Sequence, residues 1–489
     1  MNDSTPRTPR EIRIDDGWTI PAEDGVHRRT LVKGSAWTVP VLALSVATPA
    51  AAASGSPTLA FTQSSYSGKA CGTITGVQVK RTTDGSTADP GKVVTVRLAD
   101  GYTFADGSTT VSRTTGTDGL VTLPDITVPS SGGDSAFKAA SDSLTTSARV
   151  SSTASDKTGI YLYDYANKKS SDVVTDSATA KTMVSDGADT QFYYQNSDGT
   201  IRDSGGKILE GTESGVSTDP ALFSASRWGN KTTVAYKKSD GVYLRDYSGK
   251  STSGPIKNSA KAVRVISDAA GSQLYFQNSD GSLYDASGTP IEGTESGVST
   301  DAGLVSASRV NNTSTLHYKK SDGIYSYDYS KGETSGPITD SATATRLISN
   351  ANSHQFYFQT SNGKIYDGSG KIIPGTENGV STDTTLIAAS HVNNRSTIHY
   401  KKSDGIYSYD YEKKATSGPI AFSSDAKSII ADADSNQFYF QTPNGTIRNG
   451  SGEALTGTDT DVDTGDGLVS ASLLSNRTTI AYKKSPACS

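Results

Sequence analysis

The chain repeats itself with a period of 82 residues, and this feature constrains its fold more than any other. The signature Tyr-Lys-Lys-Ser-Asp-Gly occupies 236–241, 318–323 and 400–405, and a fourth copy at 482–485 stops after its serine. A second signature, Gln-aromatic-Tyr-aromatic-Gln, occupies 191–195, 273–277, 355–359 and 437–441, with Leu274 in one aromatic slot. Because the two signatures align with each other, the underlying unit has about 41 residues and occurs in two alternating types.

A unit of this length with three or four short strands is typical of one blade of a β-propeller. In one unit we expect strands at 222–227, 232–238 and 242–247, with a short edge near Pro255. In the next we expect them at 262–267, 272–278 and 282–285, with an edge near Pro290. Four units of each type predict an all-β domain with eight blades. An open solenoid is the alternative, but it would need capping repeats.

The two ends of the repeat region complement each other. The last copy breaks off at Ser485 inside a hairpin turn, and residues 155–165 begin in the same turn and match 239–247. We therefore expect the C-terminal strands to supply the inner part of a blade whose outer strands come from 159–174. This closes the ring and leaves no open sheet edge. The predicted propeller covers 155–485, and 486–489 form a tail.

Residues 56–153 carry a different pattern. Strand-like runs at 58–62, 73–80, 92–98, 119–123, 135–140 and 145–151 alternate with Asp-Gly and Gly-rich turn signals. Such spacing predicts a β-sandwich of about 100 residues. The runs 90–96 and 115–123, followed by a strand with Phe137, resemble invasin-type bacterial Ig-like domains. The resemblance implies a spacer or adhesive module without catalytic residues.

The N-terminal segment 1–53 has the organisation of an export signal. A long polar lead-in precedes Arg28-Arg29, an apolar stretch spans 34–47, and an Ala-rich end follows at 50–53. The paired arginines resemble twin-arginine signals, and the segment looks actinobacterial. This implies export of a folded protein to the extracellular space, released or associated with the cell wall. An uncleaved anchor is the alternative, but the apolar core is short for a span, and no membrane span is expected in the mature chain.

The chain has two cysteines, Cys71 and Cys488. In an oxidising compartment an even count predicts a disulfide, here between the first domain and the segment after the closing strand. Two free thiols and intermolecular pairing remain alternatives.

Charge and composition exclude several classes of function. The net charge of −5 with both signs interspersed offers no basic face for nucleic acid. The histidines after the export signal, His317, His354, His391 and His399, form neither a metal-spaced pair nor a catalytic triad order. The acidic loop 459–467 resembles a calcium loop but has Thr464 where an EF-hand needs glycine, so we expect a solvated loop. No metal, cofactor or catalytic residue is predicted.

The segment 191–203 resembles the central hairpin of fucose-binding propeller lectins, in which an Arg opens the first strand, an acid ends the second and a Trp stacks on the sugar. The Arg position is occupied here by Gln191, Gln273, Gln355 and Gln437. The acid position is occupied by Asp203, Asp285, Asp367 and Asn449, and the Trp position holds Trp228 in one copy only. The resemblance implies that these Gln and Asp side chains hydrogen-bond sugar hydroxyls while Tyr or Trp228 stacks on the ring. The alternative is that Gln and Asp pair across the hairpin as scaffold.

Together these features predict a secreted, monomeric, non-catalytic binding or adhesion protein for a glycan or another cell-surface partner. Repeated weak sites would gain strength through multivalency. One alternative is a secreted glycan-active enzyme with a single site in the propeller channel, for which 459–467 is the candidate acidic cluster. Another is a structural cell-wall protein that binds no small ligand.

Overall fold

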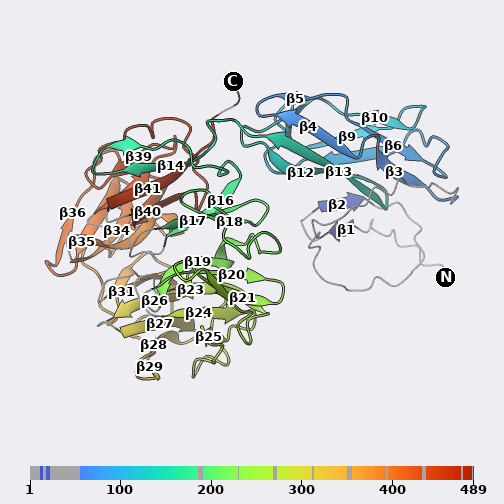
Figure 1. The fold of residues 1–489 in the computed structure, drawn as a ribbon. Helices are drawn as coiled ribbons and strands as arrows, with labels where there is room; N and C mark the ends of the chain where they lie inside the picture. The colour runs from blue at the N-terminus through green and yellow to red at the C-terminus, as the bar shows by residue number, and fades with distance from the viewer. Residues whose placement is uncertain are drawn as a thin grey trace, which may run out of the picture. The chain divides into compact units, whose positions relative to one another are not determined.

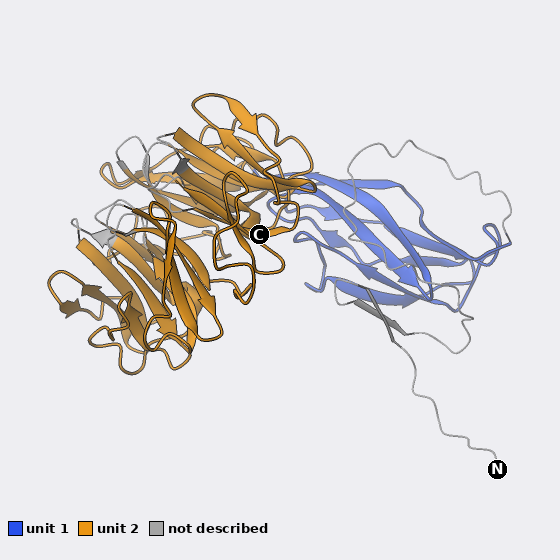
Figure 2. Ribbon diagram, turned by 90° about the horizontal axis from the view of Figure 1, so that it is seen from below, with its two compact units in different colours: residues 1–155, 488–489 blue, residues 156–487 orange. Residues whose placement is uncertain are grey.

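A computed structural model describes residues 11–14, 18–21, 55–185, 191–228, 231–267, 273–310, 313–349, 355–392, 395–431, 437–474, 477–486 and 488. The chain divides into two compact units (Figure 2). Unit 1 contains residues 1–155 and 488–489, and unit 2 contains residues 156–487. Both units are built of β-strands, with only two short 3-10 helices in the described residues.

The predicted export signal lies almost wholly outside the described residues, including Arg28-Arg29 and the apolar stretch. Within it, β1 (Glu11–Ile14) and β2 (Trp18–Pro21) pair as an antiparallel hairpin. In the described part of the chain, no helix is long and apolar enough to cross a membrane.

Unit 1 places eleven further strands in three sheets (Figure 1). The first sheet consists of β10 (Leu120–Thr122), β6 (Gln78–Thr82) and β3 (Thr58–Phe61). The second consists of β5 (Thr73–Ile74), β11 (Ile126–Thr127) and β8 (Thr103–Phe104). The third consists of β4 (Ser65–Lys69), β13 (Leu144–Thr153), β12 (Gly133–Ser141), β7 (Val93–Arg97) and β9 (Thr110–Thr114). One hydrophobic core, centred on Tyr102, Phe104 and Phe137, joins all three sheets.

The prediction of one strand at 73–80 is wrong. The run divides into β5 and β6, which pair in different sheets. Gly76 lies between them with φ of +69°, a conformation that glycine adopts without a steric penalty. The strand β9 was not predicted, because its side chains are mostly exposed and show no alternation of apolar and polar residues.

Unit 2 contains eight sheets in the described residues. Three of the four-stranded sheets are β19 (Phe223–Trp228), β20 (Lys231–Lys238), β21 (Gly241–Asp246), β22 (Ser251–Ser253); β26 (Val305–Val310), β27 (Thr313–Lys320), β28 (Gly323–Asp328), β29 (Glu333–Ser335); and β33 (Ile387–Val392), β34 (Arg395–Lys402), β35 (Gly405–Asp410), β36 (Ala415–Ser417). The fourth is β40 (Val469–Leu474), β41 (Arg477–Lys484), β14 (Gly159–Asp164), β15 (Lys169–Ser170). The three-stranded sheets are β16 (Ala180–Ser185), β17 (Phe192–Asn196), β18 (Ile201–Asp203); β23 (Ala262–Ser267), β24 (Leu274–Asn278), β25 (Leu283–Asp285); β30 (Ala344–Ser349), β31 (Phe356–Thr360), β32 (Ile365–Asp367); and β37 (Ser428–Ala431), β38 (Phe438–Gln441), β39 (Ile447–Asn449). The helices η1 (Pro220–Leu222) and η2 (Thr384–Leu386) precede β19 and β33.

The first strands of the eight sheets contact one another in a closed cycle: β40, β16, β19, β23, β26, β30, β33, β37 and again β40. Eight hydrophobic clusters fill the spaces between neighbouring sheets, one for each step of the cycle. Unit 2 is therefore a β-propeller, because only a ring of radially stacked sheets buries both faces of every sheet in this order. The predicted edge at Pro290 pairs with Tyr284, whereas the edge predicted near Pro255 lies earlier, at β22, since proline has no N–H for a ladder.

The sheet that contains β14 and β41 closes the ring. Residues 159–164 pair antiparallel with 479–484, and Figure 1 shows green β14 beside red β41. The last strand of the chain is thus the second strand of the sheet whose outer strands come from the start of the repeat region.

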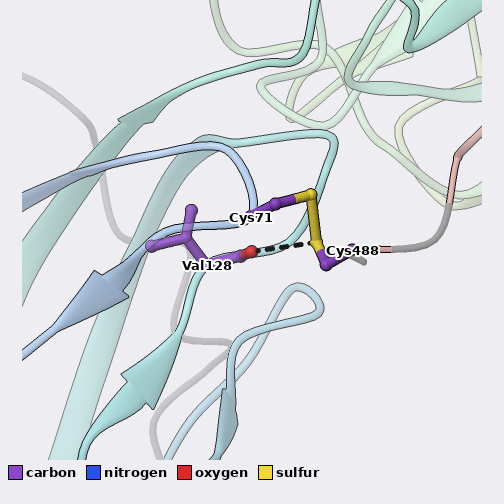
Figure 3. The surroundings of a disulfide bond; sticks show 3 residues. All are labelled: Cys71, Val128 and Cys488. Carbon is purple, nitrogen blue, oxygen red and sulfur yellow. Dashed lines mark hydrogen bonds between the residues drawn. A yellow bond between two sulfur atoms is a disulfide. The ribbon is translucent and has the colours of Figure 1, made fainter.

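After β41 the chain returns to unit 1. Cys488 forms a disulfide with Cys71, with the two Cα atoms 4.9 Å apart and 417 positions apart in sequence (Figure 3). The Cys71 N–H donates to the Val128 carbonyl at 3.1 Å, and Sγ of Cys488 lies 3.5 Å from the same oxygen. The two halves of the bridge therefore meet at one carbonyl beside β11.

Candidate binding site

The acid position of the lectin-like hairpin is buried and hydrogen-bonded within the fold. Asp203, Asp285 and Asp367 are each less than 9 % exposed. In Asp203, Oδ1 accepts from the N–H groups of Gly205 and Lys207 at 2.9 and 3.0 Å. The other two copies make the same turn, with an added serine hydroxyl. One carboxylate oxygen in each copy therefore stabilises a tight turn.

The second carboxylate oxygen joins neighbouring sheets. It accepts a tyrosine hydroxyl from the next four-stranded sheet, at 3.0 Å from Tyr247, 3.5 Å from Tyr329 and 3.3 Å from Tyr411. In the closing copy Asn449 takes the position, and its amide donates to the Tyr165 hydroxyl at 3.1 Å. The acid position therefore acts as a pin between sheets in all four copies, including the one that closes the ring.

The glutamines of the Arg position are also engaged. Oε1 of Gln191 accepts from the Ser204 hydroxyl at 2.8 Å, and the Gln273 side chain lies beside the Tyr329 hydroxyl. Gln355 and Gln437 have interaction partners too. Trp228 ends β19, but its side chain lies outside the described part of the molecule. The Asp residues of the predicted site are therefore hydrogen-bonded to tyrosines and turns of the fold itself. The glutamines that open the same hairpins have partners as well.

A different feature has the dimensions of a ligand site. A cavity of about 570 Å³ is lined by five successive first strands, β26, β30, β33, β37 and β40, together with η2, β38 and the loop before β40. It therefore lies in the central channel. Small-molecule sites occupy about 300–1,000 Å³. None of the eight predicted glycan-binding residues lines it.

The cavity is lined by residues that differ from those at the equivalent positions of the repeat. Two channel-facing serines, one from each of two neighbouring sheets, hydrogen-bond in the earlier copies: Ser224 with Ser267 at 2.8 Å and Ser306 with Ser349 at 2.5 Å. The next pair of sheets has Ala388 and Ala431 at these positions. The position of Arg264 and Arg346 is taken by Ser428 in the fourth copy. Three shorter side chains thus meet at one part of the channel wall.

The acidic loop 459–467 borders this cavity through residues 464–467. Asp463 Oδ1 accepts the Gly465 N–H at 2.9 Å and so shapes the loop, whereas Asp466 is exposed and belongs to the cavity lining. Among the residues that the structure describes, no group of three or more His, Cys, Asp or Glu side chains could hold a metal ion.

The two equivalent histidines are core residues. The ring nitrogens of His317 lie 2.8 Å from the hydroxyls of Ser308 and Ser326, so that one nitrogen donates and the other accepts. The ring stacks on Phe356 at 3.8 Å, and His399 repeats the arrangement on Phe438. Burial lowers the pKa of both imidazoles to about 3, which keeps them neutral. His354 and the His391 side chain lie outside the described residues.

No family model matches the chain, and no curated protein matches it. Similar solved structures include the computationally designed Ika8 protein, at 14 % identity and a TM-score of 0.40, covering 62 % of this chain and 96 % of that one. Streptogramin B lyase matches at 11 % identity and 0.37, covering 67 % and 98 %. BamB from Moraxella catarrhalis matches at 13 % identity and 0.34, covering 63 % and 86 %. The lyase and BamB are β-propeller proteins. TM-scores this low do not support a fold assignment. The assignment of a propeller therefore depends on the closed cycle of sheets in unit 2.

Sequence reasoning named the acidic loop 459–467, of which 464–467 line the cavity, but missed the lining residues on the strands. Their signal is present in the repeat, because Ser428, Ala388 and Ala431 each differ from the residue found at the same position in two or three other copies. What the sequence could not supply is that Ala388, on one strand, meets Ser428 and Ala431, on a strand 40 residues later, at one part of the channel.

Proposed function

We propose that this protein is an exported, non-catalytic binding protein that takes one glycan ligand per chain in the central cavity of an eight-bladed propeller. Eight sheets and eight intersheet clusters in one cycle support the blade count. The layered sheets of unit 1 and its resemblance to invasin-type domains support an Ig-like spacer. The twin-arginine resemblance of 1–53 supports export.

One observation carries the proposal: among the described residues, the channel cavity lies where the repeat departs from its own consensus. Removing packed side chains costs stability, because the lost contacts are not replaced. A purely structural ring gains nothing from such losses. The loss of these side chains leaves a cavity of about 570 Å³ with hydroxyl-bearing and aliphatic walls, which can hold a ligand.

The test restores the consensus. We expect the mature chain to bind a hit from a glycan array with calorimetric stoichiometry near one. The triple variant Ala388→Ser, Ala431→Ser, Ser428→Arg should lose at least a hundredfold in affinity while its melting temperature stays close to that of the parent. Each new residue already occupies the same position in another copy, so the variant is expected to fold.

The control is the quadruple variant Gln191→Ala, Gln273→Ala, Gln355→Ala, Gln437→Ala. It leaves the cavity intact and should bind as the parent does. Stoichiometry near four, lost in this variant, would instead establish repeated lectin sites. A blank array on folded protein would favour a structural cell-wall role.

The exposed Asp466 in the cavity lining favours a second candidate, a glycan-active enzyme with one site in the channel. In that case prolonged incubation of the hit with the protein would release shorter products, and Asp466→Asn would stop their release without preventing binding. We expect no products.

A further inference from the structure

One position of the repeat places a guanidinium at the channel in two copies, and the two copies use it differently. Arg264 acts as a brace, because its guanidinium donates to Oε1 of Gln277 and to the carbonyls of Thr300 and Asp301, each at 3.2 Å. These bonds tie β23 to β24 and to the loop before β26. Arg264 does not line the cavity.

Arg346 lines the cavity and makes fewer bonds. Among the described residues its hydrogen-bond partner is the Thr384 carbonyl. Asp383 interacts with it electrostatically, and Oδ1 of Asp383 accepts the N–H and the hydroxyl of Thr385. Burial lowers the pKa of Arg346 to about 10, so the group stays charged at neutral pH. A guanidinium carries five N–H donors, and a partly buried cation with few partners favours an anion in the space beside it.

The wall beside Arg346 offers hydroxyls and an amide oxygen. In the first copy Thr182 replaces the arginine, and the amide Oε1 of Gln195 is buried without a partner. In the fourth copy Ser428 replaces it, and Gln441 lines the cavity. The Gln441 amide donates to the carbonyls of Gly445 and Asp463, at 3.2 and 2.9 Å, which leaves its oxygen as an acceptor. Other hydroxyls line the cavity: those of Thr384 and Thr464, and those of Ser306, Ser349 and Thr385, which also have partners within the fold.

The acid in the lining does not oppose this charge preference strongly. Asp466, and Asp383 beside Arg346, are exposed, so water and salt screen them, whereas Arg346 is partly buried and is screened less. The cavity therefore presents one effective cation and a set of groups that hydrogen-bond hydroxyls.

We propose that the central cavity selects an acidic saccharide, with Arg346 binding its carboxylate and with Gln441 and Ser428 binding neighbouring hydroxyls. The inference rests on the proposed function and adds the chemical class of the ligand. A bidentate guanidinium–carboxylate pair fixes orientation as well as charge.

The experiment uses matched pairs. Glycans that carry uronic or sialic acid are arrayed beside their carboxylate methyl esters, and the best pair is titrated by calorimetry with the mature full chain. We expect the acid to bind at least tenfold more tightly than its ester. Arg346→Gln should weaken binding of the acid about ten- to hundredfold and leave the ester unchanged. Arg346→Lys should keep part of the preference, because an ammonium supplies charge without the planar fork.

Arg264→Gln is the matched control, since it removes the same group from the same repeat position outside the cavity. It should keep the acid preference, and its melting temperature reports any loss of the brace. Asp466→Asn should strengthen binding of the acid about two- to threefold, with little effect on the ester.

Equal binding of acid and ester, or an unchanged preference in Arg346→Gln, overturns the carboxylate anchor. The single-site function then still stands if Ala388→Ser, Ala431→Ser, Ser428→Arg abolishes binding. Absence of binding to every glycan of both forms, by protein with an intact melting transition, overturns both.

Discussion

The interfaces between neighbouring sheets of the propeller, here called seams, are of two kinds. One kind keeps the same contact in every copy of the repeat, and the other does not. Four pinned seams carry the bond between an Asp or Asn and a tyrosine, and this bond is present in every copy. The other four, the stacked seams, use two chemistries. In the second and third copies a buried histidine hydrogen-bonds two serines and stacks on a phenylalanine. In the first and fourth copies an alanine and larger apolar groups fill the same place.

The difference shows what a repeat can change. At a pinned seam a buried polar group must find its partner, and few side chains reach that geometry. At a stacked seam the volume can be filled in two ways, provided that the whole set changes together. The matching sets are Ala235, Leu244, Leu274 and Ala286 in the first copy and His317, Ser326, Phe356 and Gly368 in the second. In the first copy the hydroxyl of Ser226 is buried and has no partner among the described residues.

Lowering the pH should destabilise the stacked seams that contain histidine but not those that contain alanine, and this is the largest effect we expect. His317 and His399 have pKa values of about 3 in the fold, because burial disfavours their charged forms, against about 6.5 when unfolded. Between these values the unfolded chain binds protons that the folded chain does not. The free energy of unfolding is therefore unaffected above about pH 6.5 and falls below it by about 1.4 kcal/mol per pH unit for each histidine. Urea denaturation at pH 7 and pH 4.5 measures the loss.

The repeat supplies the control for this experiment. The variant His317→Ala, Ser326→Leu, Phe356→Leu, Gly368→Ala rebuilds the second stacked seam as the first. We expect about half of the histidine-dependent loss to disappear. An acid sensitivity that is the same in parent and variant would contradict the assignment of the titration to these rings.

A pinned seam should lose about 2–4 kcal/mol of unfolding free energy in Asp367→Ala, because a buried carboxylate that accepts from Ser369, Lys371 and Tyr411 disappears. Asp367→Asn keeps an acceptor for the turn, as Asn449 does in the closing copy, and should cost less than about 1 kcal/mol. Thermal and urea unfolding of both variants measure the difference. Equal losses would show that the charge, rather than the turn, stabilises the seam.

Removing single tyrosine hydroxyls should show whether the shorter of the hydrogen bonds at the pinned seams stabilise the fold more. Tyr247→Phe deletes a 3.0 Å bond to Asp203 and should cost about 1 kcal/mol. Tyr329→Phe deletes a 3.5 Å contact with Asp285 and should cost less. The reverse order in urea unfolding would mean that the distances do not rank the pins.

The smallest effect is expected at a turn where one copy departs from the others. Phe422 has φ of +61° and is 68 % exposed, whereas the equivalent residues are Asp176, Asn258 and Asp340. Asparagine tolerates this left-handed conformation better than phenylalanine does. Phe422→Asn should therefore stabilise the fold by up to about 1 kcal/mol, less the stacking of Arg448 on the ring at 4.5 Å. A lower melting temperature would show that the stacking outweighs the strain.

The sequence was sufficient for the features that repeat. The period predicted the alternating sheets, and the match between 155–165 and 239–247 predicted the pairing of β14 with β41. Features that depend on distant contacts were not predictable. The hairpin positions of Asp203 and Asp367 fitted both ligand contacts and a scaffold role, since only the positions of Tyr247 and Tyr411 decide where the second oxygen bonds. The cavity was likewise not predictable, because the departures at Ala388, Ala431 and Ser428 are visible in the repeat but their meeting in the channel is not.

The bond between Cys71 and Cys488 has a mechanical consequence. A tensile load applied between a point before Cys71 and Cys488 follows the covalent path across the sulfur atoms. The 416 residues between the two cysteines, which include every blade, form a loop off that path and carry no tension. Reduction of the bridge would route the same load through the chain between the cysteines, where the pairing of β14 with β41 would bear it.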